Sequence, residues 1–333
     1  MTAPSITATV EAALGALEPV WGETTGAVAR RGAPLILNAD GTPRKVRRTT
    51  PSATTGGPSG SHYPRPNGED YWARFIKTGS TVTDVDALRM NRGADIPTVL
   101  WGDPGTGKSA LIEAAFADQP GGLYTVPGHG HMEEGALLGS WQQQPDGTYV
   151  FVKGPALLAA ENGGVLFVDE IALIPPATLA VLYPLMDGRR ETTVDANLSL
   201  GTIKAQPGFF VVGAYNPNAP GARVSEALTS RFIFSVEVTT DYDLAKSLGV
   251  PAKFVTLARN ISTKKMSGEL AWAPQLRELL GAKKVTDLYG DEAMAIANLV
   301  SGAPEDDREV VAAMASRVFG HTVENLRLGE QAK

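Results

Sequence analysis

The chain has 333 residues, of which 43% are hydrophobic and 20% charged, as is typical of a globular protein with a sizeable core. Its 30 Lys and Arg residues against 36 Asp and Glu residues give a net charge of −6, which argues against a general nucleic-acid binder. The absence of cysteine excludes a disulfide scaffold, thiolate metal sites and a cysteine nucleophile, and it suits a reducing cytoplasm.

Residues 1–62 are predicted to form an N-terminal segment that is flexible or that orders only against a partner. A short amphipathic helix is expected at residues 5–20, and the chain from there to Gly68 is rich in Gly, Pro, Ser and Thr, as in a linker. Its basic cluster, residues 44–48, is interpreted as a solvated charge run rather than a contact for nucleic acid or an acidic partner. With neither a signal peptide nor about 20 consecutive apolar residues for a membrane span, we expect a soluble, cytoplasmic protein without membrane contact.

Short β-rich runs then alternate with helical patterns, which predicts an α/β fold with a parallel sheet covered by helices on both faces. After residue 241 only helical patterns remain. We therefore predict an α/β core over residues 63–240 and a small all-helical lid over residues 241–333. The predicted strands cover residues 97–101, 123–126, 165–168, 209–214 and 232–238, and the predicted helices cover residues 84–92, 108–117, 176–186, 251–259, 274–280, 291–300 and 304–319.

The strongest motif is the run GDPGTGKS at residues 102–109, which matches the G-x-x-x-x-G-K-[ST] pattern of a phosphate-binding loop. Its glycines let backbone N–H groups point at phosphate oxygens, and the start of the following helix adds partial positive charge. Lys108 is expected to reach the β- and γ-phosphates of ATP, and Ser109 to bind Mg²⁺. The predicted nucleotide-binding residues are Gly102, Asp103, Pro104, Gly105, Thr106, Gly107, Lys108, Ser109 and Ala110.

A second motif is an apolar strand at residues 165–168 that ends in two acids, Asp169 and Glu170. Asp169 is expected to hold Mg²⁺, partly through water, and Glu170 to accept the proton of an attacking water. A buried strand that ends in surface acids is the alternative, and beside a phosphate-binding loop it becomes the lesser interpretation. Together the two motifs predict ATP hydrolysis.

A third element is the predicted strand at residues 209–214, which is followed by Asn216 and Pro217. An amide at the end of a central strand is able to hydrogen-bond the attacking water or the γ-phosphate. Because Asn before Pro is also a turn signal, a plain turn remains the alternative.

With these motifs the chain resembles the AAA+ ATPases, in particular the MoxR/CbbQ branch, which groups with the dynein-related ATPases. The resemblance runs from about residue 63 to residue 318 and includes a β-hairpin insert near residues 139–155. Residues 169–176 are similar to the family's segment after the acidic pair. Ala172 and Leu173 stand where many relatives carry Asn and Arg, and the resemblance therefore does not extend to the contacts that this loop makes between subunits in the family.

The resemblance implies roles for three further residues. Asn216 matches the sensor-1 position, and Arg231 matches the arginine finger that reaches the neighbouring subunit's ATP. Arg277 lies near the sensor-2 position of the lid, although relatives usually place that arginine closer to the preceding proline. A planar, permanently charged guanidinium suits developing phosphate charge. The alternatives are a surface salt bridge for Arg231 and a helix-surface charge for Arg277.

Two smaller features have structural interpretations. His129 and His131 alternate with glycines and are interpreted as a turn rather than a metal site, with a substrate-facing loop as the alternative. Trp141, Tyr149 and Phe151 lie near the expected hairpin with the period of a strand, and core packing is favoured over a grip on substrate.

The resemblance implies a homo-oligomer, a hexameric ring, that uses ATP to remodel or activate a client protein. It further implies either a von Willebrand factor A-type adaptor or a metalloenzyme client. A nucleic-acid-dependent motor or defence-system ATPase is the alternative, supported by the basic cluster and opposed by the net charge. A scaffold that binds ATP without turnover is disfavoured by Glu170 and Arg231.

Overall fold

The structure, a computed structural model, describes residues 60–77 and 81–329 of the chain. The predicted helix at residues 5–20 and the basic cluster at residues 44–48 lie outside the described residues. Within the described ranges, no helix combines the length and the apolar content that crossing a membrane requires.

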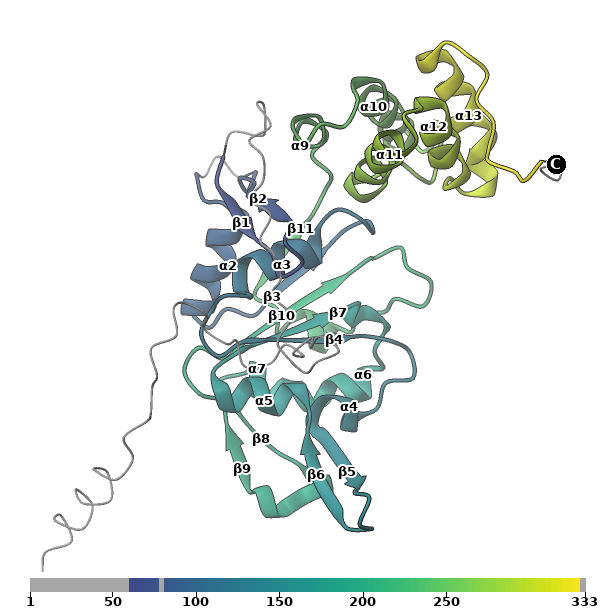
Figure 1. The fold of residues 1–333 in the computed structure, drawn as a ribbon. Helices are drawn as coiled ribbons and strands as arrows, with labels where there is room; N and C mark the ends of the chain where they lie inside the picture. Colours follow the sequence, from purple (N-terminus) through teal and green to yellow (C-terminus); the bar gives the residue numbers. More distant parts are fainter. Residues whose placement is uncertain (1–59, 78–80, 330–333) are drawn as a thin grey trace, which may run out of the picture. The chain divides into compact units, whose positions relative to one another are not determined.

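A parallel β-sheet forms the centre of the fold (Figure 1). In the described part of the chain its strand order is β11–β3–β10–β7–β4, and each neighbouring pair is parallel. The predicted α/β fold class is therefore confirmed. The strands are β3 (Thr98–Trp101), β4 (Leu123–Pro127), β7 (Val165–Asp169), β10 (Phe210–Tyr215) and β11 (Phe234–Glu237).

Helices cover both faces of this sheet, with α2 (Asp84–Gly93) and α3 (Lys108–Phe116) on one face and α5 (Pro155–Asn162) on the other. Alternate residues of β7 face the two layers: Val165 and Phe167 pack with α2 and α3, whereas Leu166 and Val168 pack on the side of α5. All four are at most 2% exposed. Because β7 is buried on both faces, its sequence is a continuous apolar run.

A short antiparallel hairpin precedes α2, formed by β1 (His62–Pro64) and β2 (Asp70–Trp72). The sequence predicts a linker up to Gly68, so the structure differs there. Tyr71 is buried beside α2, and its hydroxyl donates to the carboxylate of Asp84. Arg74 reaches the same carboxylate at 3.3 Å. A few side chains therefore dock this Gly- and Pro-rich segment onto the helical layer that contains α2.

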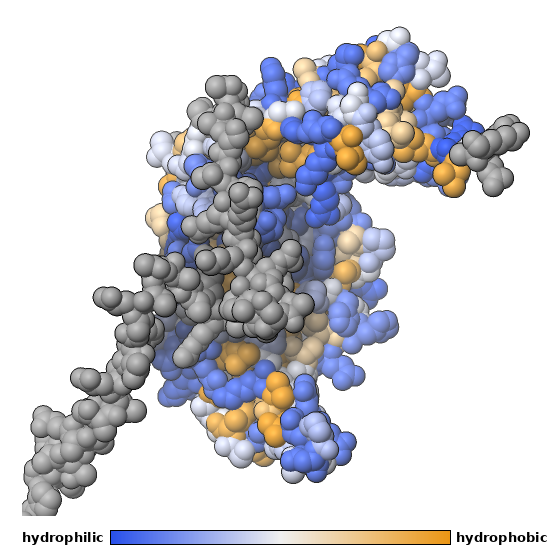
Figure 2. All heavy atoms as spheres, in the orientation of Figure 1, coloured by the Kyte–Doolittle hydropathy of each residue, from blue (hydrophilic) through white to orange (hydrophobic). Residues whose placement is uncertain are grey.

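Two more hairpins lie beyond α5, namely β5 (Gly139–Gln143) with β6 (Tyr149–Lys153) and β8 (Glu191–Thr193) with β9 (Thr202–Lys204) (Figure 1). The first is the predicted insert. Core packing is wrong for Trp141 and Tyr149, which are 49% and 62% exposed, and apolar residues reach the surface at this end (Figure 2). Phe151 alone of the three packs partly against the core. Too few residues pack against this two-stranded sheet to bury the apolar side chains that alternate along its strands.

The helix predicted over residues 176–186 is helical throughout, but it is not one continuous α-helix. It is divided into α6 (Pro176–Leu179), the 3₁₀ turn η2 (Ala180–Leu182) and α7 (Tyr183–Met186). Pro184 has no N–H to donate to the carbonyl of Ala180, so a continuous helix would leave that carbonyl without its partner. Leu179, Leu182 and Leu185 are nevertheless buried, because the short pieces keep the apolar face that the sequence predicts.

Helices follow the sheet and share a hydrophobic core that includes Phe254, Ile261, Leu279 and Val311. α10 and α11 extend well beyond their predicted ends, because polar surface positions continue a helix after its apolar pattern fades. Asp241 caps the first of these helices through its side chain. The helices are α9 (Tyr242–Ser247), α10 (Ala252–Met266), α11 (Leu276–Tyr289), α12 (Glu292–Ser301) and α13 (Glu305–Phe319).

Replacing Asp307 by alanine is expected to lower the free energy of unfolding by about 1.5–3 kcal/mol. The buried carboxylate of Asp307 accepts hydrogen bonds from the backbone N–H groups of Ala271 and Trp272, each at 2.9 Å. Urea denaturation followed by circular dichroism measures the loss. The matched control is Asp306→Ala, which removes an exposed carboxylate from the same helical turn. Equal losses in the two variants would contradict the assignment to these hydrogen bonds.

Candidate active site

The loop at residues 102–109 joins β3 to α3 and takes the conformation that its glycines allow. Gly102, Gly105 and Gly107 have φ angles of +145°, +84° and +97°. A Cβ atom at Gly102 would lie 2.5 Å from the carbonyl oxygen of Val238. Gly107 is the N-cap of α3 and has no side chain that could accept from the first turn. The first N–H groups of α3 are therefore left for an anionic ligand.

Lys108 is buried at the start of α3, and its ammonium donates to the carbonyls of Gly102 and Asp103 at 2.8 and 2.9 Å. Burial lowers the pKa of Lys108, an effect that the charge of Arg277 reinforces and the carboxylates of Glu170, Asp169 and Asp103 oppose. The loop therefore places a cation among its own carbonyls, where phosphate oxygens are able to replace them as partners.

The next residue brings together the two predicted Mg²⁺ ligands. The hydroxyl of Ser109 donates to Asp169 Oδ2 at 3.1 Å, and Asp169 ends β7. A hydroxyl and a carboxylate are the hard oxygen ligands that Mg²⁺ prefers, and Mg²⁺ usually completes its shell with waters and phosphates. The described residues contain no group of three or more His, Cys, Asp and Glu that could hold a metal. This pair therefore fits Mg²⁺ bound together with a nucleotide rather than a metal held by the protein alone.

Glu170 follows β7 in a left-handed conformation, with φ +47° and ψ +41°. Its backbone N–H donates to Asp169 Oδ1 at 3.0 Å. Its own Oε2 is buried and has no hydrogen-bond partner among the described residues. An unpaired buried carboxylate oxygen is costly unless a ligand or water satisfies it. Glu170 thus fits a group that binds a water molecule in this cleft.

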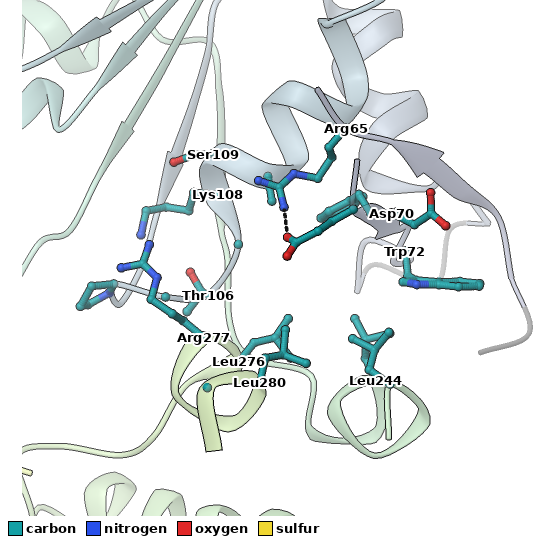
Figure 3. A pocket seen from close by; sticks show the side chains of 18 of the residues that line it. Arg65, Asp70, Trp72, Thr106, Lys108, Ser109, Leu244, Leu276, Arg277 and Leu280 are labelled. Carbon is teal, nitrogen blue, oxygen red and sulfur yellow. Dashed lines mark hydrogen bonds and ion pairs between the residues drawn. The ribbon is translucent and has the colours of Figure 1, made fainter. Parts of the chain in front are cut away.

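Residues 104–110, Asp169 and Glu170 line one cleft of about 870 Å³, within the range of small-molecule sites. Of the predicted nucleotide-binding residues, Gly102 and Asp103 are not part of this lining. Helices α9 and α11 contribute Leu244, Leu276 and Leu280 to its wall, together with Arg277 (Figure 3). The guanidinium of Arg277 lies beside the ammonium of Lys108 in this view. The structure therefore places Arg277, an exposed residue of α11, along the cleft with the phosphate-binding loop, and its sensor-2 role stays a prediction.

Sequence reasoning missed the wall formed by the hairpin β1–β2. Asp70, Tyr71 and Trp72 line the cleft there, across from the leucines of α9 and α11. The pair Tyr71-Trp72, directly after a stretch without apolar residues, is the one signal that could have indicated a docked segment. Aromatic and aliphatic side chains on opposite walls suit a flat, apolar ligand group such as a nucleobase.

Asn216 and Arg231 are absent from the lining of this cleft in the described part of the chain. Asn216 follows β10, and its side-chain oxygen accepts from the N–H of Asn218 at 3.0 Å, as in a turn, while its sensor-1 role stays a prediction. Arg231 donates to the carbonyl of Ala227 at 2.7 Å, and its guanidinium lies 4.0 Å from the ring centroid of Tyr183. Its buried Nε has no hydrogen-bond partner among the described residues.

The loop that carries His129 and His131 is a turn, as predicted, and it lies beside the end of β7. The backbone N–H of His131 donates to Nδ1 of His129 at 3.3 Å. A Cβ atom at Gly128 would lie 2.7 Å from the carbonyl oxygens of Asp169 and Glu170. Because it has no Cβ atom, Gly128 allows this loop to approach the backbone of Asp169 and Glu170 closely.

Comparison with known proteins gives one family match and several relatives. Residues 97–232 match the AAA domain of the dynein-related subfamily. An uncharacterized protein of Staphylococcus haemolyticus is 28% identical over 71% of this chain and 94% of its own length. Protein NorQ of Paracoccus denitrificans is 31% identical over 43% of this chain and 51% of its own length. An uncharacterized protein of Staphylococcus aureus is 34% identical over 45% of this chain and 58% of its own length. The chain thus spans about half the length of the last two relatives. The expected MoxR-type AAA+ resemblance is confirmed.

Proposed function

We propose that this chain, whose residues 97–232 form an AAA domain of the dynein-related subfamily, hydrolyses ATP in the cleft between the phosphate-binding loop and the C-terminal helices. The observation that carries the proposal is the meeting of three features at one place. These are the first turn of α3, which has no side-chain cap, the hydrogen bond between Ser109 and Asp169, and the unpaired oxygen of Glu170. Each matches one requirement of phosphoryl transfer to water.

The residues divide the chemistry among them. Lys108 and the N–H groups at the start of α3 bind and orient the phosphates, and Arg277 adds a second cation to the lining of the same cleft. Mg²⁺, which Ser109 and Asp169 would hold, supplies further positive charge when bound. Glu170 orients a water molecule through its unpaired oxygen and accepts a proton from it.

We further propose that the chain acts as a ring of identical subunits, hexameric as in the resembling family, and that a neighbour's Arg231 completes each cleft. Support comes from the position of Arg231, which does not line its own chain's cleft within the described ranges. The contact with the ring of Tyr183 holds the guanidinium of Arg231 in a fixed position, where it offers a positive charge. An arginine that acts across an interface makes hydrolysis depend on assembly.

The client is proposed from the resemblance as a protein or protein complex that the ring remodels, with a von Willebrand factor A-type adaptor as partner. The net charge of −6 supports a protein client over the alternative, a nucleic-acid-dependent motor or defence-system ATPase. Stimulation of ATP hydrolysis by DNA or RNA, without stimulation by protein, would reverse this preference.

The direct test is binding and hydrolysis of ATP by the full chain. Calorimetry with ATP and Mg²⁺ is expected to show one site per chain, and a phosphate-release assay is expected to show turnover that EDTA stops. Folded protein that gives no heat with ATP and Mg²⁺ would overturn the proposed function.

Arg231→Ala is expected to bind ATP within about threefold of the wild type and to hydrolyse it at least about tenfold more slowly, because it removes transition-state charge stabilisation. Mixing it with Lys108→Ala chains is expected to restore part of the activity, since those chains offer Arg231 to intact clefts. Calorimetry and phosphate release measure both properties. The matched control is Arg189→Ala, an exposed arginine paired with Asp187. A dilute monomer that hydrolyses ATP as fast per chain as the assembly would contradict the role in trans.

A further inference from the structure

Asp103, the second residue of the phosphate-binding loop, contacts the helical region rather than the cleft. Its carboxylate accepts from the ammonium of Lys265 and from Nε2 of Gln275, the latter at 3.3 Å. Lys265 lies in the last turn of α10, and Gln275 is the N-cap of α11. One carboxylate therefore joins the end of one helix and the start of the next to the loop.

The start of α11 also contacts the loop directly. The backbone N–H of Arg277 donates to the carbonyl of Gly105 at 3.2 Å. A Cβ atom at Gly105 would lie 3.1 Å from Cβ of Arg277, so the two backbones are packed closely. The Gln275 side chain also accepts from Thr240 at 2.6 Å. The position of Arg277 therefore depends on how the first turn of α11 is held against the loop.

A second ion pair between the helices and the rest of the fold is much more open to solvent. Lys284 of α11 lies 3.4 Å from Glu69, and the two side chains are 75% and 56% exposed. The side chains of Lys265 and Asp103 are only 28% and 27% exposed. Exposed ion pairs are screened by water and salt and contribute little to stability. Of the two pairs, the one between Lys265 and Asp103 is therefore expected to contribute more to holding the helices against the loop.

We propose that Lys265 is a positioning residue for ATP hydrolysis. Through Asp103 it holds the end of α10, and with it the first turn of α11, at the distance from which Arg277 reaches the phosphates. The inference rests on the proposed function, because it assumes that the loop binds ATP and that Arg277 acts on it. It assigns Lys265 no contact with the nucleotide, since the effect passes through Asp103 and Arg277.

The test compares Lys265→Met with Lys264→Met in the full chain. Lys264 is the preceding residue and pairs with Glu269, so its replacement removes the same charge from the same helix end. Lys265→Met is expected to lower kcat by about tenfold and to change KM for ATP by less than threefold, because a misplaced guanidinium stabilises the transition state less. Lys264→Met is expected to match the wild type, and Lys265→Arg to keep most of the activity. Asp103→Asn approaches the same contact from the loop and is expected to lower kcat in the same direction.

A double-mutant cycle with Arg277→Ala separates positioning from a general structural role. If Lys265 acts through Arg277, adding Lys265→Met to Arg277→Ala is expected to lower kcat by less than twofold more. A full tenfold further loss, or a Lys265→Met variant indistinguishable from Lys264→Met, would overturn the inference. Both results differ from failure of the proposed function, in which the wild type itself neither binds nor hydrolyses ATP.

Discussion

Replacing Lys108 by alanine is expected to weaken the binding of ATP and Mg²⁺ by about 100-fold. The ammonium of Lys108 is buried and is held by two loop carbonyls, so it is fixed in place before phosphates arrive. A charge-assisted contact in such surroundings is worth about 3 kcal/mol, which corresponds to roughly 100-fold in affinity. Truncation also leaves the carbonyls of Gly102 and Asp103 without their donor, which loosens the loop.

Calorimetry measures the affinity, and thermal unfolding with and without ATP gives an independent readout, because a ligand that binds the folded state raises Tm. The matched control is Lys204→Ala, which removes an exposed lysine of β9 that lies 3.7 Å from Glu191. Binding within threefold of the wild type by Lys108→Ala would mean that the triphosphate lies elsewhere, and the roles given to Ser109 and Asp169 would fail with it.

The parts of the site that the sequence predicts are those built from short, contiguous stretches. The phosphate-binding loop and the acids after β7 need only a strand, a turn and the start of a helix, and each leaves a local pattern in the sequence. The parallel sheet then follows from alternating strand and helix patterns. The contact between Ser109 and Asp169 could be expected because parallel strands end at one edge of a sheet.

The parts that the sequence does not predict depend on contacts between distant segments. Asp103 and Lys265 are 162 positions apart, and no sequence pattern links the two residues. The wall contributed by Tyr71 and Trp72 comes from a segment whose composition resembles a linker. The exposure of Trp141 likewise depends on how much of the fold covers the hairpin, which strand alternation does not specify.

Glu170→Gln is expected to bind ATP and Mg²⁺ at least as tightly as the wild type and to hydrolyse it about 10³-fold more slowly. Glutamine keeps the size of the side chain but cannot take a proton from water, and loss of a general base costs on the order of 10²–10⁴-fold. Affinity is maintained because the substitution removes a negative charge that faces Lys108 and hence the phosphates. The ATP-bound assembly is therefore expected to persist, and size-exclusion chromatography with ATP checks this.

Combining the two measurements distinguishes a base from a ligand of the nucleotide. A residue that mainly binds ATP·Mg²⁺, as proposed for Asp169, lowers affinity when it is neutralised, whereas neutralising Glu170 is expected to lower turnover alone. Single-turnover phosphate release separates slow chemistry from slow product release. Glu191→Gln, on β8, is the matched control and is expected to behave as the wild type. If Glu170→Gln retained turnover within tenfold, its unpaired oxygen would have another use, and the water would have to be oriented by a different group.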